Sequence, residues 1–173
     1  GLNEIKTDGI DAIIAADSGM DFLYENGVTP DIIVGDFDSA TTKALEFFER
    51  KGQTEIHRLN PIKDDTDTEY AIRLAIREGA RSIVLLGATG SRIDHVLGNI
   101  SLLGIGLESG TDISIIDTNN RIRMADRPVT IEKSAQYGRF VSLIAVTDDN
   151  EVSLRGFKYP VTDYSFDRFT SLG

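Results

Sequence analysis

Short apolar runs alternate with helix-like segments over the first two-thirds of the chain, and this alternation limits the possible folds more than any other feature. The runs Ile32–Val34 and Ser82–Leu86 are typical of buried strands, and each precedes a segment with apolar residues at helical spacing. Parallel strands joined by helices need right-handed crossovers, which place the helices against the faces of the sheet. Residues 1–120 are therefore predicted to form a mostly parallel, three-layer α/β domain.

The helix predicted over residues 66–78 carries the clearest local signals. Thr66 and Glu69 have the spacing of a capping box, in which the first side chain caps the helix N-terminus. Apolar residues follow at helical spacing, and Gly79 stands just past the predicted end. A second long helix is predicted over residues 94–110.

The pattern changes near residue 121, where short β-type runs separated by turns replace the helices. Runs such as 140–146 and 151–157 fit this description, and no helix of useful length follows. We therefore predict a second domain, residues 121–173, as a small antiparallel β-sandwich. Because so few residues bury little apolar surface, we expect this domain to be incomplete at its C-terminus and completed by more chain or by a partner subunit.

Composition excludes several classes of function. The net charge of −10 argues against a nucleic-acid partner, because the phosphate backbone needs a basic face. The chain has no cysteine, which excludes disulfides, thiolate metal sites and cysteine nucleophiles. We find no signal peptide and no apolar run long enough to cross a bilayer. We expect a cytoplasmic protein that binds neither nucleic acid nor membrane.

Acidic residues follow the ends of successive predicted strands. Asp17 follows the first predicted strand, and Asp36 and Asp38 follow the second. Asp64 and Asp67 lie in the stretch that follows the third predicted strand. Ligands bind at the carboxyl edge of an open parallel sheet, where these positions meet. Each aspartate alone could belong to a turn or a helix cap. The set at equivalent positions instead favours a shared site for a hard cation such as Mg²⁺.

A glycine-containing turn follows the fourth predicted strand. The backbone amides between Gly87 and Gly90 could receive a phosphate, although the turn lacks the complete Walker A and dinucleotide-binding patterns. Arg92 could hold a phosphate through two hydrogen bonds, and Asp94 could accept a proton or orient a substrate hydroxyl. The alternative is that Asp94 caps a helix beside a surface residue, His95.

Six stretches, in this order, resemble the thiamine pyrophosphokinase (thiamine diphosphokinase) family: AADSG, GDFDS, KDDTDTE, GATGSRIDHVLGN, IDTNN and LRGFKYP. The resemblance implies an N-terminal α/β catalytic domain for ATP and Mg²⁺ and a C-terminal β-sandwich domain for thiamine. It also implies a homodimer with active sites between the subunits. The implied reaction transfers the diphosphate of ATP to the hydroxyl of thiamine, giving thiamine diphosphate and AMP.

The resemblance also implies roles for individual residues. The family's metal-binding aspartates correspond to Asp36, Asp38 and Asp67, which together with Asp94 form the expected catalytic set. The general base stays open between Asp94 and metal-assisted deprotonation without a dedicated base. The residues expected to bind substrate are Asp17, beside the nucleotide phosphates, and Asp64, Thr66, Gly87, Gly90, Arg92, His95 and Asn99.

The sequence departs from the family pattern in two places, and two other functions stay open as alternatives. The family normally begins with a further strand and glycine-containing loop and continues into strands that help to hold thiamine, and neither segment is in this sequence. Phosphohydrolases of the haloacid dehalogenase type also place Asp-x-Asp after a buried strand, although Ala40 stands where they have Thr or Val. A nucleotide- or thiamine-binding module without turnover is the non-enzymatic alternative.

Overall fold

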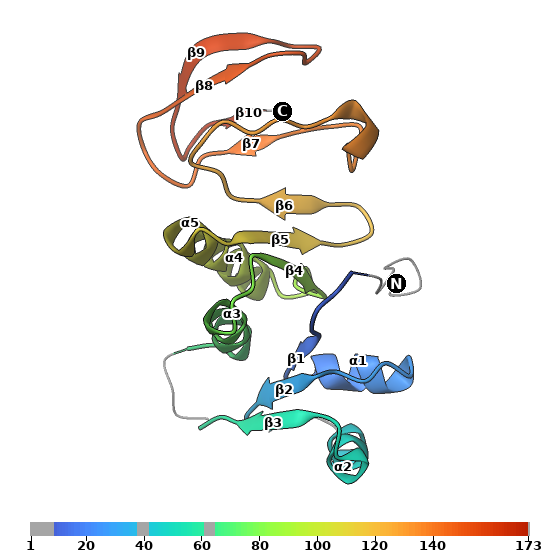
Figure 1. Ribbon diagram of the computed structural model, residues 1–173. Coiled ribbons are helices and arrows are strands. Elements are labelled where there is room, and N and C mark those ends of the chain that lie inside the picture. Colours follow the sequence, from blue (N-terminus) through green and yellow to red (C-terminus); the bar gives the residue numbers. More distant parts are fainter. Residues whose placement is uncertain (1–8, 38–41, 61–64, 173) are drawn as a thin grey trace. The chain divides into compact units, whose positions relative to one another are not determined.

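The computed structural model describes residues 9–37, 42–60 and 65–172. The chain divides into two compact units, Gly1–Thr130 and Ile131–Gly173 (Figure 1). The α-helices lie in the first unit, whereas the second is built mainly from short strands and turns. The boundary expected between residues 120 and 121 lies just before a strand that pairs within the first unit.

The first unit alternates strands and helices, as the sequence predicts. Its elements are β1 (Ile14–Ala16), α1 (Gly19–Glu25), β2 (Ile32–Gly35), α2 (Thr42–Lys51), β3 (Glu55–Arg58), α3 (Asp67–Arg77), β4 (Ser82–Leu86), α4 (Ile93–Leu102), α5 (Gly104–Ser109), β5 (Asp112–Ile116) and β6 (Arg121–Arg123). Among the described residues, the strands form two three-stranded sheets, β1-β2-β3 and β4-β5-β6. Only β5 and β6 pair antiparallel in these sheets, so the expectation of a mostly parallel α/β region is confirmed.

Helices α1 and α2 share one apolar core with the sheet β1-β2-β3. Met20 and Phe48 from the helices are buried there against Ala15 and Ile33 from the strands. Val34, which strand alternation places on the other face of β2, is also fully buried. Helix α3 packs against β1 and β2. Helices therefore accompany both faces of this sheet, in agreement with a three-layer arrangement.

Helix α3 begins as its local sequence predicts. Thr66 is the N-cap, and its hydroxyl oxygen accepts a hydrogen bond from the backbone N–H of Glu69 at 3.1 Å. Asp67 and Glu69 lie in the first turn, where negative charge is stabilised by the helix dipole. The capped end of α3 thus fixes Asp67 at the start of a helix that packs against β1 and β2.

A second apolar core lies between the sheet β4-β5-β6 and helices α3, α4 and α5. Ile115 is fully buried in this core, and Ile83 and Leu85 of β4 pack against it. Val84 and Leu86 point to the opposite face and are 50% and 43% exposed. The prediction of a buried strand over Ser82–Leu86 is therefore correct for one face of β4 and wrong for the other.

The single helix predicted over residues 94–110 is two helices, α4 and α5. They meet at Leu103, which is buried, and the bonds around it span three residues: Leu103 N–H to Ile100 O and Gly106 N–H to Leu103 O, both at 3.1 Å. Such bonds tighten the helix locally and interrupt the α-helical pattern. Helix α5 ends at Gly110, whose φ of 74° is the left-handed C-cap that the sequence predicts. In the described part of the chain, no helix combines the length and the apolar character that crossing a membrane requires.

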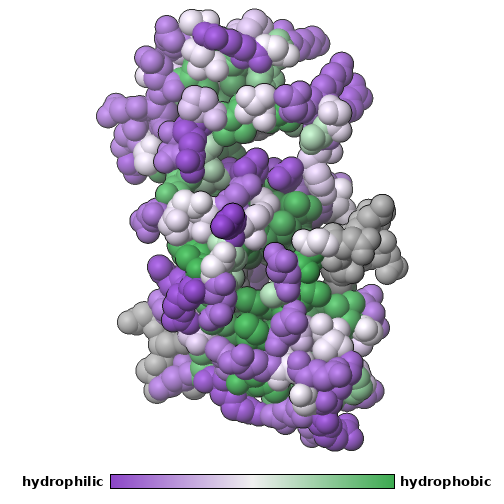
Figure 2. Space-filling model, viewed as in Figure 1, coloured by the Kyte–Doolittle hydropathy of each residue, from purple (hydrophilic) through white to green (hydrophobic). Residues whose placement is uncertain are grey.

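The second unit contains short strands and few buried side chains. Its elements are η2 (Lys133–Ala135), β7 (Leu143–Ile144), β8 (Asn150–Leu154), β9 (Val161–Phe166) and β10 (Ser171–Leu172). Strand β7 pairs antiparallel with β10, and β8 with β9, which confirms the expected antiparallel β region. Among its described residues, only Ala145 is buried. Figure 2 shows apolar surface between the polar side chains of this unit, at the top of the view.

Candidate active site

Three aspartates from separate segments meet at the carboxyl ends of β1 and β2. Asp17 follows β1, Asp36 follows β2 and Asp67 is the first residue of α3. All three are partly buried, and one carboxylate oxygen from each lies within 4.8 Å of the other two. Carboxylates at this spacing repel one another unless a cation joins them, and a donor set made of oxygens alone suits a hard divalent cation. These residues therefore fit a metal site.

Two residues of this site have left-handed backbone conformations that are uncommon outside glycine. The φ angles are 45° at Asp17 and 62° at Phe37, next to Asp36. The backbone N–H of Asp17 donates to the carbonyl oxygen of Val34 at 2.8 Å, which continues the pairing of β1 with β2. Conformations of this kind persist where the surroundings enforce them, and they are concentrated at functional sites.

Gly35 permits the close approach of the two strand ends. A Cβ atom at this position would lie 3.1 Å from the ring of Phe37 and 3.3 Å from the Cα atom of Asp17. The ring of Phe37 packs against the first core, and its centroid lies 5.3 Å from the guanidinium carbon of Arg58. The loop that carries Asp36 is therefore held by the packing of Phe37 against the first core and by the contact of its ring with Arg58.

The structure describes only some of the residues that we expected to bind metal. Asp36 and Asp67 come together as expected, but Asp38 and the substrate residue Asp64 lie outside the described residues. Asp17, which we expected beside the nucleotide phosphates, joins the carboxylate group. Its position at the end of β1 indicated a shared site, but the order of the strands does not predict the distance between its carboxylate and those of Asp36 and Asp67.

A pocket of about 330 Å³ lies between the start of α3 and helix α4. Its lining includes the expected substrate residues Thr66, His95 and Asn99 and the expected catalytic residue Asp94. The first turn of α3 also supplies Asp67 to the aspartate group, so the pocket and the candidate metal site share one helical turn. Helix N-termini carry unpaired N–H groups and a partial positive charge, which favour an anionic ligand.

Arg92 and Asp94 form an exposed ion pair at the start of α4. Arg92 donates from Nε to Oδ1 of Asp94 at 3.2 Å and from Nη2 to Oδ2 at 2.5 Å. The side-chain hydrogen bond from Arg92 lowers the pKa of Asp94 below its usual value, and the same bond raises the pKa of Arg92. A carboxylate with a lowered pKa is a weaker base, so this pairing argues against Asp94 as the general base.

The glycine-containing turn lies between β4 and α4, outside the lining of this pocket. Gly87 has a φ of 70°, which explains glycine directly after the strand. Asn99 of α4 donates from Nδ2 to the carbonyl oxygen of Ala88 at 2.9 Å. One of the expected substrate residues, Asn99, is thus bonded to the turn that we expected to receive phosphate.

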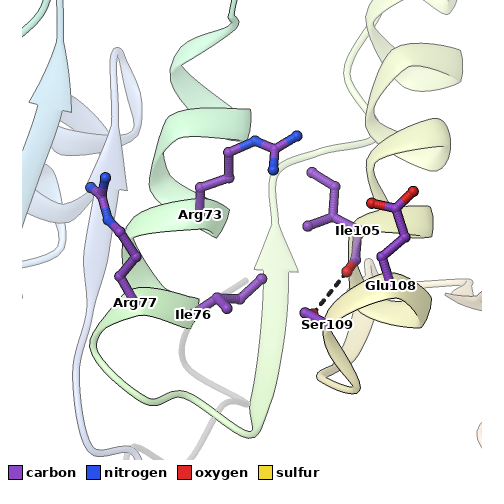
Figure 3. A pocket seen from close by; sticks show the side chains of 6 residues that line it. All are labelled: Arg73, Ile76, Arg77, Ile105, Glu108 and Ser109. Carbon is purple, nitrogen blue, oxygen red and sulfur yellow. Dashed lines mark hydrogen bonds between the residues drawn. The ribbon is translucent and has the colours of Figure 1, made fainter.

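A pocket of about 360 Å³ between α3 and α5 offers less chemistry, although it is slightly larger (Figure 3). Arg73 pairs with Glu69, with 2.8 Å between Nη2 and Oε1. The hydroxyl of Ser109 donates to the carbonyl oxygen of Ile105 at 2.8 Å. Arg77 points away from Ile105 in this view. Because Arg73 and Ser109 are bonded within their own helices, we assign no substrate to this pocket.

Both units match families that are described by one activity. Residues 6–115 match "Thiamin pyrophosphokinase, catalytic domain" and residues 128–173 match "Thiamin pyrophosphokinase, vitamin B1 binding domain". The chain is 36% identical over 152 residues to thiamine pyrophosphokinase of Bacillus subtilis (strain 168), a match that covers 87% of this chain and 70% of that protein.

Solved structures give the same result. A crystal structure of thiamine pyrophosphokinase from Bacillus subtilis has a TM-score of 0.77 at 31% identity and covers 92% of this chain and 72% of that one. For thiamin pyrophosphokinase from Geobacillus thermodenitrificans, the TM-score is 0.79 at 30% identity, with 98% and 80% covered. The fold, the order of the two units and the sequence all agree, and the chain belongs to the thiamin pyrophosphokinase family.

Proposed function

We propose that this chain transfers the diphosphate of ATP to the hydroxyl of thiamine, giving thiamine diphosphate and AMP. The observation that carries the proposal is the group of Asp17, Asp36 and Asp67, which shares the first turn of α3 with a pocket that extends along α4. Transfer of a phosphoryl-type group depends mainly on positioning and on neutralising charge, and this arrangement can do both. Family membership supports the same reaction.

We assign Mg²⁺ to this aspartate group. Asp17, Asp36 and Asp67 would hold it, with Asp38 as a further ligand on the basis of sequence alone. When bound, the ion would neutralise negative charge on the triphosphate and its leaving oxygens. The left-handed backbone at Asp17 and Phe37 holds the strand ends so that their carboxylates converge before any ligand arrives.

The pocket residues would position the nucleotide. The N-termini of α3 and α4 would supply backbone N–H groups to phosphate oxygens, and Arg92, next to the pocket lining in sequence, would add a cation whose direction Asp94 fixes. His95 and Asn99 complete the pocket on the side of α4. We assign ATP and Mg²⁺ to residues 1–120 and thiamine to residues 121–173, as the two matched family descriptions suggest.

We also propose that the protein is a homodimer whose contacts include residues 121–173. Large apolar side chains in this region are strongly exposed: Phe140 by 86%, Ile144 by 76% and Phe169 by 90%. Covering such side chains in an interface removes apolar surface from water, which is the main favourable term in association. Sedimentation should give a dimer at micromolar concentration, and a well-folded monomer would contradict this assignment.

Release of AMP tests the reaction. The protein should form AMP from ATP only when Mg²⁺ and thiamine are both present, with one thiamine diphosphate formed for each AMP. A phosphohydrolase would instead release inorganic phosphate from phosphomonoesters without thiamine. A binding module would bind Mg·ATP and form no AMP. Either of the last two results would overturn the proposed function.

A further inference from the structure

The side chain of His57 lies on the face of the sheet β1-β2-β3 that helix α3 covers. His57 of β3 is the register partner of Val34 in β2, and paired residues of neighbouring strands point to the same face. Ile33 points to the opposite face, into the core that α1 and α2 share. Val34 is fully buried, and α3 packs against β1 and β2. The sheet therefore presents His57 to α3.

The imidazole ring of His57 joins β3 to α3 through a hydrogen bond. Its Nδ1 atom lies 3.2 Å from the hydroxyl oxygen of Tyr70 on α3, and its Nε2 atom lies 2.6 Å from Oε1 of Glu55. A carboxylate accepts hydrogen bonds and does not donate them, so Nε2 carries the proton. In the neutral ring, Nδ1 then accepts a hydrogen bond from the hydroxyl of Tyr70. The bond to Glu55 thus fixes the ring in the orientation that Tyr70 needs.

Tyr70 also closes the turn of α3 that carries Asp67. Its backbone N–H donates to the carbonyl oxygen of Thr66 at 3.0 Å, and Asp67 lies inside this first turn. The guanidinium carbon of Arg77 lies 5.7 Å from the centroid of the Tyr70 ring, which adds a second contact to the same side chain. A tyrosine that is held at its hydroxyl therefore restrains the backbone of the turn that carries Asp67.

The strand that holds His57 leads to the other two aspartates of the candidate metal site. Its partner Val34 accepts the hydrogen bond from the backbone N–H of Asp17, and Asp36 follows β2 directly. Apolar packing of α3 against β1 and β2 has no preferred direction, whereas a hydrogen bond has a preferred distance and angle. The bond from His57 to α3 therefore determines where the turn with Asp67 lies relative to the two strand ends.

We infer that His57 is a positioning residue for Asp67: through Tyr70, it holds the first turn of α3 in place relative to the ends of β1 and β2. It thereby sets the distances from the carboxylate of Asp67 to those of Asp17 and Asp36. This inference rests on the proposed function, because the metal ion is assigned to these three aspartates there. His57 acts through Tyr70 and is not itself a proposed ligand. Loss of the bond should therefore weaken the binding of a divalent cation.

Calorimetry of Mn²⁺ binding without ATP or thiamine tests this role. Tyr70→Phe removes the hydroxyl and keeps the ring, and it should raise the Kd for Mn²⁺ about fivefold, as expected for one lost hydrogen bond. His57→Phe removes both ring nitrogens and should have the same effect. His57→Asn keeps an acceptor near the place of Nδ1 and should bind Mn²⁺ like the parent protein. The double variant with both phenylalanines should bind no more weakly than the weaker single variant, because both changes remove one bond.

Tyr24→Phe is the matched control, because it removes the same atom from another tyrosine of the first unit. Tyr24 lies on α1, and its ring contacts Phe47 and Phe48 of α2. Its removal of a hydroxyl should leave the Kd for Mn²⁺ unchanged. Urea unfolding of the same variants separates positioning from stability. A loss of stability in Tyr70→Phe without a change in Kd would give the bond a structural role alone and would overturn the inference.

Backbone hydrogen exchange gives a readout that does not depend on metal. The amide of Tyr70, which bonds to Thr66, should exchange faster in His57→Phe and at the parent rate in His57→Asn. Unchanged exchange in His57→Phe would contradict the inference, as would additive losses of Mn²⁺ affinity in the double variant or an equal loss in Tyr24→Phe. If the parent protein bound no Mn²⁺, the metal assignment of the proposed function would fail, and the inference with it. Equal Mn²⁺ binding by the parent and Tyr70→Phe would refute the inference alone.

Discussion

The two units of this chain bury their apolar side chains to very different extents. In the first unit, Phe48 is 1% exposed and Ile115 is fully buried, each in its own core. In the second unit, Phe140 and Phe169 are 86% and 90% exposed, and the described strands enclose little beyond Ala145. The first unit can therefore hold a site in place through its own packing, whereas the second presents apolar side chains for other contacts.

This difference explains where the defined geometry of the site lies. Asp17 and Asp36 follow strands of the first core, and Asp67 begins a helix that packs against those strands. The packing of buried residues therefore fixes the spacing of the three carboxylates. The proposed thiamine contacts, in residues 121–173, lack such support in the described chain, so we expect them to depend on assembly. Four measurements test this difference between the two units.

The largest effect is expected from a matched pair of phenylalanine substitutions. Phe48→Ala should lower the free energy of unfolding by about 3–5 kcal/mol, because it leaves a cavity in the first core. Phe140→Ala should change it by only about 0.5 kcal/mol, since that side chain is exposed. Urea unfolding of both variants at the same concentration makes the comparison. Similar losses would show that the second unit has a core of its own.

The second prediction concerns the aspartate group. Asp67→Asn should reduce the rate of AMP formation roughly a hundredfold, because one charge that holds the metal is lost. Its unfolding free energy should stay close to that of the parent, since Asp67 is not part of either apolar core. AMP release and urea unfolding measure the two parts, with Asp112→Asn as the control for charge. Unchanged affinity for Mg·ATP in Asp67→Asn would show that the metal assignment is wrong.

Local signals allowed much of the first unit to be predicted. The capping box at Thr66 and the left-handed glycine at Gly110 act through residues that are close in sequence, so their effect can be read directly. The clustering of acids at strand ends also indicated that Asp17, Asp36 and Asp67 lie close together. Asp17 joined the carboxylate group because β1 pairs with β2, and this depends on pairing that the sequence does not display.

The errors of prediction arose where tertiary contacts override local patterns. The interruption of the long helix at Leu103 accompanies burial of that residue in the second core, whereas its local sequence favours a continuous helix. No local pattern indicated strand β6, because Arg121-Ile122-Arg123 has a single apolar residue and the strand forms by pairing with β5.

The third prediction compares two glycines, one from each unit. Gly35→Ala would place a methyl group 3.1 Å from the ring of Phe37 and 3.3 Å from Asp17 Cα, so the strand ends must separate. We expect Mn²⁺ affinity to fall about tenfold and stability to fall by about 1–2 kcal/mol. Gly138→Ala meets nothing within 4 Å and should change neither. Equal Mn²⁺ affinity in the two variants would show that the close approach at Gly35 does not control the aspartate spacing.

The prediction with the smallest expected effect concerns the pKa of Asp117. It tests whether the fixed geometry of the first unit extends to its surface turns. The hydrogen bond from the Asn120 side chain, followed by that from the backbone of Asn119, lowers the pKa of Asp117 from 3.8 to about 2. A carboxylate with a lowered pKa in the folded state stabilises the fold at pH values above 3.8, and this contribution is lost as the pH falls toward 2. Carbon-13 NMR titration of the Asp117 carboxyl carbon should therefore give a pKa well below that of an ordinary aspartate.

Two substitutions then show which contacts hold this turn. Asn120→Ala should raise the pKa of Asp117 more than Thr89→Val does, because the Asn120 side chain is the strongest of its donors and Thr89 is weaker. The order of these two shifts separates the contribution of the turn's own side chain from that of Thr89. An ordinary pKa in the parent protein would mean that the turn is mobile. The defined geometry of the first unit would then end at its buried strands.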